Sequence, residues 1–163
     1  MYVICGLGNP GVKYLGTRHN VGFKFLNEIF NRYESKIIKK NKSKEIYLTN
    51  IKKEKYYLIK TLTYMNLSGP PIGRILNYYK IPKKNLLVVH DDLDLVIGKI
   101  KIKQGGGNGG HRGLQSIDTI IGNSYKRVRI GIGHPGSKYL VDQYVLQKFN
   151  SGEEKIISKL IKF

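Results

Sequence analysis

Short apolar runs that alternate with glycine-rich loops and helical patterns constrain the fold of this chain more than any other feature. Residues 2–5, 86–89 and 126–132 have the length and composition of buried strands, and each run ends at glycine or at polar residues. Strands that alternate with helices favour one sheet covered by helices. The sequence therefore predicts an α/β sandwich with a twisted, mixed and mostly parallel sheet flanked by helices. We expect a single domain over residues 1–163.

Periodicity and turn residues predict the remaining elements. Predicted helices cover residues 21–33, 72–79 and 114–121 and two segments near the C-terminus, and further strands cover 45–51, 55–62 and 99–103. Thr17 or Asn20 can cap the first helix, Ser68 the second, and Ser151 opens the last. The lysine-rich residues 35–44 are the one segment that we expect to be poorly ordered.

The strongly positive charge indicates an anionic partner. The chain has 29 Lys and Arg against 11 Asp and Glu, a formal net charge of +18, which is more than solubility requires. Nucleic acid is the commonest partner for such a surface. An A/T-rich genome, whose codons favour lysine, accounts equally well for many of the lysines, so charge alone is weak evidence.

Cysteine content and hydropathy exclude several classes of protein. Cys5 is the only cysteine, so an internal disulfide framework and a thiolate zinc cluster are excluded, and its apolar surroundings favour an inert core residue. No apolar run approaches the roughly 20 residues of a membrane helix, and the first run is too short for a signal peptide. We expect a soluble cytoplasmic protein that does not contact a membrane.

The loop after the first predicted strand resembles a dinucleotide-binding loop only superficially. Residues 6–11, GLGNPG, fit the pattern G-x-G-x-x-G. In a dinucleotide site a helix begins at the second glycine and points its N-terminus at the pyrophosphate. Here Asn9 and Pro10 interrupt that helix, so the sequence disfavours a dinucleotide oxidoreductase. The loop is instead rich in polar side chains, namely Asn9, Tyr14, Arg18, His19 and Asn20.

Other polar motifs follow other predicted strands. TYMNLSG occupies residues 63–69, VVHDDLDL residues 88–95 and GGGNGGHRG residues 105–113. Ligand sites in α/β sheets lie beyond the carboxyl ends of the strands. We therefore expect these motifs to meet at one edge of the sheet.

Six motifs in order, GLGNPG, TRHNVGF, TYMNLSG, VVHDDLDL, GGGNGGH and RIGIGHPG, resemble bacterial peptidyl-tRNA hydrolase over residues 1–149. The resemblance implies hydrolysis of the ester that joins a peptide, or another N-blocked aminoacyl group, to the 3′ end of tRNA. This reaction recycles tRNA from peptidyl-tRNA that drops off ribosomes during translation. The resemblance also implies a monomer that binds peptidyl-tRNA and needs no cofactor or metal.

The resemblance assigns catalytic roles to four residues. His19 corresponds to the general base that activates water, and Asp91 to the carboxylate that orients and stabilises its imidazole. Asn66 corresponds to the amide that holds substrate and water and donates toward the developing oxyanion. Asn9 corresponds to the residue that separates N-blocked from free aminoacyl-tRNA, since an amide both donates and accepts hydrogen bonds.

A second set of residues is implied to bind tRNA or the attached residue. This set is Tyr14, Tyr64, Met65, Asn66, Lys103, Arg112 and Arg129. The tyrosines and the methionine offer apolar and stacking surface, and Lys103 and Arg129 correspond to positions that grip phosphates. Lys101 and Arg127 are expected to extend this phosphate-binding surface. Phosphate contacts do not read sequence, so we expect many tRNAs to be accepted.

The chain departs from the family pattern at two places. Arg112 stands where the family usually has asparagine; it loses an acceptor and adds a cation that favours the tRNA backbone. The chain also ends at Phe163, earlier than is typical, so we expect its last helix to cover less of the substrate groove and activity to be lower.

An alternative from another class is an inactive, basic RNA-binding module with the same fold. The intact set of His19, Asp91 and two asparagines argues against it, because binding alone does not require a histidine with a carboxylate partner. A metal site at His90 is disfavoured because neighbouring strand residues point to opposite faces. The remaining polar residues of these motifs, Asp92, Asp94 and His134, are interpreted as turn or capping residues.

Overall fold

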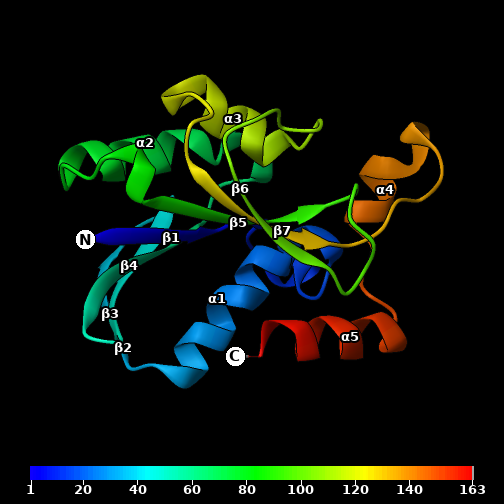
Figure 1. The fold of residues 1–163 in the computed structure, drawn as a ribbon, viewed down its shortest axis with the longest axis horizontal. Coiled ribbons are helices and arrows are strands. Elements are labelled where there is room, and N and C mark those ends of the chain that lie inside the picture. Colours follow the sequence, from blue (N-terminus) through cyan, green and yellow to red (C-terminus); the bar gives the residue numbers. More distant parts are fainter. Residues whose placement is uncertain (163) are drawn as a thin grey trace.

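A seven-stranded mixed sheet forms the centre of the computed structural model, which describes residues 1–162 (Figure 1). Phe163, where the predicted domain ends, lies outside the described residues. The strands are β1 (Tyr2–Gly6), β2 (Ser35–Lys40), β3 (Lys44–Ile51), β4 (Glu54–Thr61), β5 (Leu86–Asp92), β6 (Ile100–Gln104) and β7 (Lys126–Gly131). The α-helices are α1 (Val21–Arg32), α2 (Gly69–Tyr78), α3 (Arg112–Ile121), α4 (Val141–Val145) and α5 (Ser151–Ile161).

The strand order is β2-β3-β4-β1-β5-β7-β6. β1 pairs in parallel with β4 and β5, and β5 pairs in parallel with β7, while the other three pairings are antiparallel. The predicted mixed α/β sheet is confirmed: its centre, β4-β1-β5-β7, is parallel, and the antiparallel pairings lie toward its two edges. Short connections allow only antiparallel neighbours, and they join β2 to β3 and β3 to β4.

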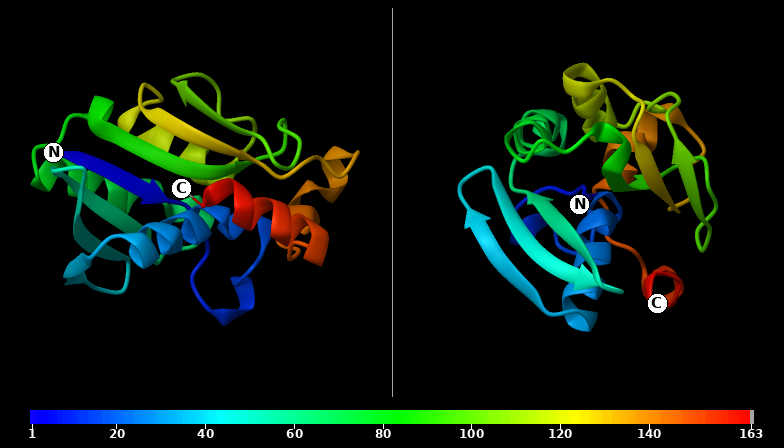
Figure 2. Two further views of the ribbon diagram at one scale, coloured as in Figure 1. Left: turned by 60° about the horizontal axis from the view of Figure 1, so that its bottom comes forward. Right: turned by 60° about the vertical axis from the view of Figure 1, so that its left-hand side comes forward.

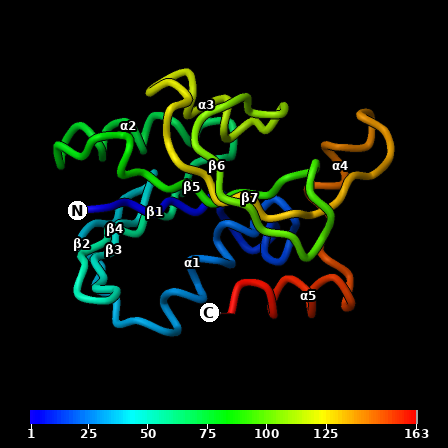
Figure 3. The backbone as a smooth tube through the Cα atoms, viewed as in Figure 1, coloured from blue at the N-terminus to red at the C-terminus, as the bar shows by residue number. Residues whose placement is uncertain are grey.

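Helices cover both faces of the sheet. Figures 1, 2 and 3 show α2 and α3 on one face and α1 and α5 on the other. Alternate residues of β1 divide between the two cores: Val3 and Cys5 pack under α2 and α3, whereas Ile4 packs toward α1 and α5. Burial of the Cys5 thiol raises its pKa, as expected of an inert core residue. None of the described helices is long and apolar enough to cross a membrane.

Two glycines let α1 approach the ends of β1 and β5. A Cβ atom on Gly22 would lie 2.4 Å from the backbone nitrogen of Leu7 and 2.5 Å from the carbonyl oxygen of Val89. A Cβ atom on Gly6 would lie 2.3 Å from the carbonyl oxygen of Gly22. The first glycine of the loop therefore serves close packing of a helix that begins ten or more residues later, and not a pyrophosphate contact.

The expectation that residues 35–44 are poorly ordered is wrong. Ser35–Lys40 forms the edge strand β2, which pairs antiparallel with β3. The loop between them is fixed by the side-chain oxygen of Asn41, which accepts from the backbone nitrogens of Ser43 (2.9 Å) and Lys44 (3.1 Å). Pairing with a neighbouring strand thus orders a segment whose own composition is unfavourable.

The helix caps also differ from the prediction. Thr17, Asn20 and Ser68 form no side-chain cap bond to the helices that they precede. Asn150, not Ser151, caps α5. Its side-chain oxygen accepts from the backbone nitrogen of Glu153 (2.8 Å), and Glu153 accepts in return from the backbone nitrogen of Asn150 (3.0 Å). This reciprocal arrangement is a capping box.

Candidate active site

A cleft of about 610 Å³ opens at the carboxyl end of β5. Its walls come from the loop after β1, the turn before α2, the glycine-rich loop before α3, and α4. The predicted site residues that line it are Asn9, His19, Tyr64, Met65, Asn66, Asp91, Lys103, Arg112 and Arg129. Tyr14 does not line the cleft, but its ring packs edge-on against Tyr64, with centroids 6.3 Å apart.

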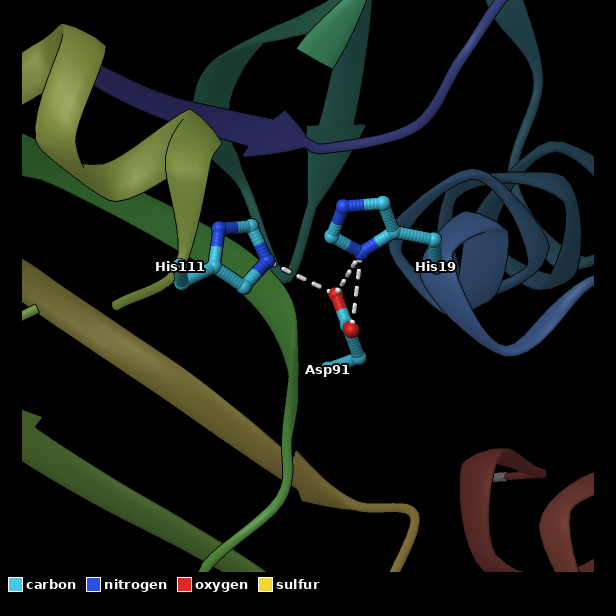
Figure 4. A group of neighbouring side chains, drawn as sticks. All are labelled: His19, Asp91 and His111. Carbon is cyan, nitrogen blue, oxygen red and sulfur yellow. Dashed lines mark hydrogen bonds and ion pairs between the residues drawn. The ribbon is translucent and has the colours of Figure 1, made fainter. Parts of the chain in front are cut away.

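A carboxylate held between two imidazoles forms the centre of the cleft (Figure 4). Asp91 is 3% exposed, and its Oδ2 atom lies 2.8 Å from Nδ1 of His19. Its Oδ1 atom lies 2.7 Å from Nε2 of His111. The two imidazole rings lie 4.9 Å apart, centroid to centroid. Sequence reasoning singled out His19 and Asp91 and did not assign His111 to the site.

Hydrogen bonds fix the tautomers of both rings. Nδ1 of His111 accepts from the backbone nitrogens of Gly113 (3.1 Å) and Leu114 (3.3 Å) at the start of α3. The proton of His111 is therefore on Nε2, which donates to Asp91. His19 donates to the same carboxylate through Nδ1, so its Nε2 points away from Asp91 with a free lone pair (Figure 4). A histidine in this tautomer can accept a proton from the cleft.

Charge and burial shift the pKa values of this group in opposite directions. Burial alone lowers the pKa of His19, but the charge and hydrogen bond of Asp91 outweigh it and raise that pKa above its ordinary value. Burial raises the pKa of Asp91, and the two imidazoles reverse this and hold it below its usual range. Asp91 is therefore ionised at neutral pH. Neighbouring His90 has a pKa lowered to about 4 by burial and by His111, so it is neutral.

Asn9 is clamped from two sides. Its backbone nitrogen donates to the side-chain oxygen of Asn20 (2.8 Å), and its carbonyl oxygen accepts from the Asn20 side-chain nitrogen (2.9 Å). Its side-chain oxygen accepts from the backbone nitrogen of Met65 (2.7 Å). One lone pair of the Asn9 side-chain oxygen is therefore already used, and the Nδ2 hydrogens have no acceptor among the described residues. Asn20, predicted as a helix cap, instead positions Asn9.

Asn66 and Met65 lie side by side in the short turn Met65–Leu67. The Asn66 side chain is exposed and forms no hydrogen bond with another described residue, so it is available to a ligand. Met65 is buried against the glycine loop, where a Cβ atom on Gly113 would lie 2.6 Å from its Sδ atom. The small residue at position 113 thus keeps Met65 and His111 in place.

The predicted phosphate-binding residues differ in exposure and in whether another residue already binds them. Lys103 is exposed at the cleft, whereas Nε of Arg129 lies 2.7 Å from Oδ2 of Asp92. Arg127 is 4% exposed, and its guanidinium donates to the carbonyl oxygens of Gly105 and Gly107. Arg127 therefore holds the glycine-rich loop, and the expectation that it also contacts tRNA phosphates stays a prediction.

Arg112, the residue that departs from the family pattern, forms an ion pair across the cleft. Its Nη2 atom lies 2.8 Å from Oδ2 of Asp142 in α4. Both side chains are mostly exposed, so solvent screens the pair and its contribution to stability is small. The pair nevertheless links the start of α3 to α4 in this structure.

The residues interpreted as turn residues behave as such. Oδ1 of Asp92 accepts from the backbone nitrogen of Asp94 (2.8 Å), and Nδ1 of His134 accepts from the backbone nitrogen of Gly136 (3.0 Å). Within the described residues, one group can offer three ligand atoms to a metal: His19, Asp91 and His111, whose atoms lie within 4.8 Å of one another. His90 is not in that group, and the expectation of a metal-free site stays a prediction.

No serine, threonine or cysteine is among the described residues that line the cleft. A histidine with a buried carboxylate partner, beside side-chain amides and without a nucleophilic hydroxyl or thiol, is typical of a hydrolase that activates water directly. The fold and the site are thus those of an α/β protein whose cleft suits a hydrolase.

Comparison with known proteins identifies the family. The family model for peptidyl-tRNA hydrolase matches residues 3–163. The chain is 47% identical over 161 residues to the peptidyl-tRNA hydrolase of Bartonella quintana, covering 99% of this chain and 83% of that protein. It is 49% identical over 162 residues to that of Rickettsia prowazekii, covering 99% and 88%. The chain belongs to the peptidyl-tRNA hydrolase family.

Solved structures agree with this assignment. A crystal structure of the peptidyl-tRNA hydrolase of Acinetobacter baumannii matches with a TM-score of 0.94 at 40% sequence identity, covering 99% of this chain and 83% of that one. The resemblance inferred from the six sequence motifs is confirmed. The alternative of an inactive RNA-binding module gains no support, because the relatives are named as hydrolases.

Proposed function

We propose that this chain hydrolyses the ester between a peptide, or another N-blocked aminoacyl group, and the 3′ end of tRNA, with His19 as the general base. Membership of the peptidyl-tRNA hydrolase family supports the substrate. The single observation that carries the mechanism is the 2.8 Å hydrogen bond from Nδ1 of His19 to the buried carboxylate of Asp91. That bond leaves Nε2 free to take a proton from water.

The reaction then needs one group that accepts and returns a proton, and one hydrogen-bond donor to the oxyanion. Nε2 of His19 accepts a proton as the water oxygen attacks the ester carbonyl, and the imidazolium is stabilised by Asp91. The side-chain nitrogen of Asn66 donates to the oxyanion of the tetrahedral intermediate. The imidazolium returns its proton to the ribose oxygen as the carbon–oxygen bond breaks. The products are the free carboxylic acid and tRNA with its 3′ terminal diol.

His111 acts through Asp91 and does not meet the reacting atoms. Its Nε2 donates to Oδ1 of Asp91, whereas the shorter contact of His19 is to Oδ2. A carboxylate that receives two N–H donors stays ionised and keeps a fixed orientation. We assign His111 as a positioning residue that aligns Asp91, and so His19, for proton transfer.

The clamped amide of Asn9 explains how N-blocked substrates are selected. The bond from the Met65 backbone nitrogen to Oδ1 fixes the orientation of the Asn9 amide, so its unpartnered Nδ2 hydrogens are offered to substrate. An N-blocked aminoacyl group brings a carbonyl oxygen that can accept such a bond. A free aminoacyl group brings an ammonium, which has no acceptor to offer and would be desolvated beside another donor. Selection thus rests on a missing acceptor in the unblocked substrate.

The tRNA end is held by stacking and charge. Tyr64, with Tyr14 packed against its ring, offers an aromatic surface to the terminal bases, and Met65 contacts the attached residue. Lys103 and Arg129 contact phosphates, and Asp92 aims the Arg129 guanidinium. Because the substrate is tRNA, we place the enzyme in the cytoplasm and expect it to act as a monomer without a metal.

Arg112 serves substrate binding, and its partner Asp142 competes with substrate for it. We expect Arg112→Asn to raise KM for N-acetyl-aminoacyl-tRNA about threefold at low salt, because one cation near the tRNA is lost. Asp142→Asn should lower KM by a similar factor, because it frees the guanidinium. The kcat values should stay within twofold. If both variants shift KM in the same direction, Arg112 does not contact substrate and the pair only shapes the cleft.

The proposed function is tested by product analysis with chelator present. The wild-type protein, incubated with N-acetyl-aminoacyl-tRNA and EDTA, should release free N-acetyl amino acid and tRNA that can be aminoacylated again. Loss of activity on chelation, restored by one added metal ion, would contradict the metal-free mechanism. Release of a shortened tRNA would show cleavage of RNA and contradict ester hydrolysis.

A further inference from the structure

A group of cations lies at the opposite end of the strand order from Lys103 and Arg129, between the hairpin β2–β3 and helix α2. We call Lys39, Lys44, Arg74 and the neighbouring Tyr78 the outer cationic cluster. Lys44 is 7% exposed, and its ammonium forms no hydrogen bond or ion pair with any residue that the structure describes. Burial, Arg74 and Lys39 together lower the pKa of Lys44. None of the three cations forms an ion pair with a described residue.

The strand register directs Lys39 and Lys44 to the same face. Lys44 lies two residues from Ile46, which packs in the core under α2, so both side chains face α2. Lys39 pairs with Ile46 and faces the same way, although Ile37 pairs with Tyr47, which packs on the opposite face. The register shift between Ile37 and Lys39 is thus a bulge that turns Lys39 toward α2, a common use of bulges at sheet edges.

The nearest acid does not neutralise this cluster. Glu45 alternates to the opposite face, where it accepts from the hydroxyl of Tyr47 (2.9 Å) and pairs with Lys40 (2.9 Å). Like charges that face the same side of a sheet repel one another, and partial burial of Lys44 adds a desolvation cost to its ammonium. Cations kept in such an arrangement are typical of a site for an anionic ligand.

The exposed ring of Tyr78 indicates which class of anionic ligand the cluster would bind. The Lys39 ammonium lies 5.4 Å from the ring centroid of Tyr78, and that ring is 73% exposed. An exposed aromatic ring among cations suits a nucleic acid, because a base stacks on the ring while phosphates contact the cations. A free phosphate or an acidic peptide carries no base that could stack on the ring.

We propose that the outer cationic cluster binds the phosphate backbone of RNA at a second contact, separate from the active site. The strand register places the cluster at the same end of the strands as the cleft. Lys44 pairs with Thr61 at the carboxyl end of β4, next to the carboxyl end of β1. Four strand spacings of about 4.8 Å, roughly 20 Å in all, separate β3 from β7, which carries Arg129. The RNA is either the tRNA being cleaved or another RNA, and this inference rests on the proposed function only in the first case.

The test compares two substrates that carry the same N-acetyl-aminoacyl ester, full-length tRNA and a short 3′-terminal fragment. The variants are Arg74→Glu and Lys39→Glu, and the control is Lys155→Glu, which makes the same charge change on exposed α5. If the cluster binds the substrate, each cluster variant raises KM for the full-length tRNA about tenfold at moderate salt and reduces the slope of log KM against log salt by about 1. KM for the fragment and both kcat values should match the control.

A second arm measures binding of an unrelated, unacylated RNA hairpin by fluorescence anisotropy. Weaker hairpin binding by the cluster variants, with unchanged KM for full-length tRNA, supports the second contact and assigns it to another RNA. Unchanged values in both arms, or equal rises in KM for tRNA and fragment, overturn the proposal. Lys44→Met should weaken RNA binding while raising the melting temperature, which excludes misfolding as the cause. Failure of the wild type to cleave the fragment would instead count against the proposed function.

Discussion

Replacing His19 with alanine is expected to reduce kcat for N-acetyl-aminoacyl-tRNA by about 1,000-fold, with KM changed by less than about threefold. General-base catalysis contributes roughly 100- to 10,000-fold, and this cleft has no second group positioned to replace the imidazole. His111 is not a substitute, because its Nε2 proton is bonded to Asp91 and its Nδ1 accepts from backbone nitrogens. Single-turnover rates with enzyme in excess measure the chemical step directly.

The matched control for this variant is His134→Ala. His134 also lines the cleft but is exposed and bonds only to the backbone nitrogen of Gly136 among the described residues. Its replacement should leave kcat within twofold of the wild-type value. A His19→Ala enzyme that keeps more than a tenth of the activity, or a His134→Ala enzyme that loses as much, would contradict the assignment of the base.

Replacing Asp91 with asparagine is expected to lower kcat about 100- to 1,000-fold while substrate binding is largely kept. Asparagine cannot accept from His19 and His111 through two equivalent oxygens, so one imidazole must change its tautomer or lose its bond. Removal of the carboxylate also removes the charge that stabilises the imidazolium during proton transfer. A carboxylate in the same position of a serine protease triad is worth about 10,000-fold.

The pH dependence distinguishes this electrostatic role from a structural one. In the wild type, Asp91 raises the pKa of His19, and only neutral His19 can act as a base. The rate should therefore rise with pH through an inflection above the ordinary histidine value of about 6.5. In Asp91→Asn, burial and the charge of Arg112 still lower the pKa of His19 and only the weaker effect of Asp142 raises it, so the inflection should move below that value. Asp94→Asn, which changes an exposed acid at the same cleft, should leave the inflection where it is in the wild type.

The sequence was sufficient to predict six of the seven strands, all except β2, and the end of the strands at which the site forms. Each of the predicted polar motifs follows an apolar run, and the carboxyl ends of β1 and β5 indeed bring His19 and Asp91 together. This success has a physical reason: the period of apolar residues fixes which runs are strands, and parallel pairing fixes which ends meet. The roles of individual residues then came from the family resemblance.

Features that depend on tertiary approach were not predictable in this way. His111 was part of the motif GGGNGGH, but only the folded glycine loop and the start of α3 direct its Nε2 at Asp91. Arg127 was expected to contact tRNA phosphates, and the loop carbonyl that it binds became its neighbour only on folding. The outer cationic cluster likewise depends on a bulge in β2, which the lysine-rich sequence did not indicate.

The most direct test of the whole account is the ratio of kcat/KM for N-acetyl-aminoacyl-tRNA to that for the same tRNA with a free amino group, measured with EDTA present. We predict a ratio above about 100 for the wild type, and a blocked-substrate rate that falls about 1,000-fold in His19→Ala. Equal cleavage of both substrates would contradict the role of the clamped Asn9 donor. Cleavage of the blocked substrate that survives in His19→Ala would contradict the general-base mechanism itself.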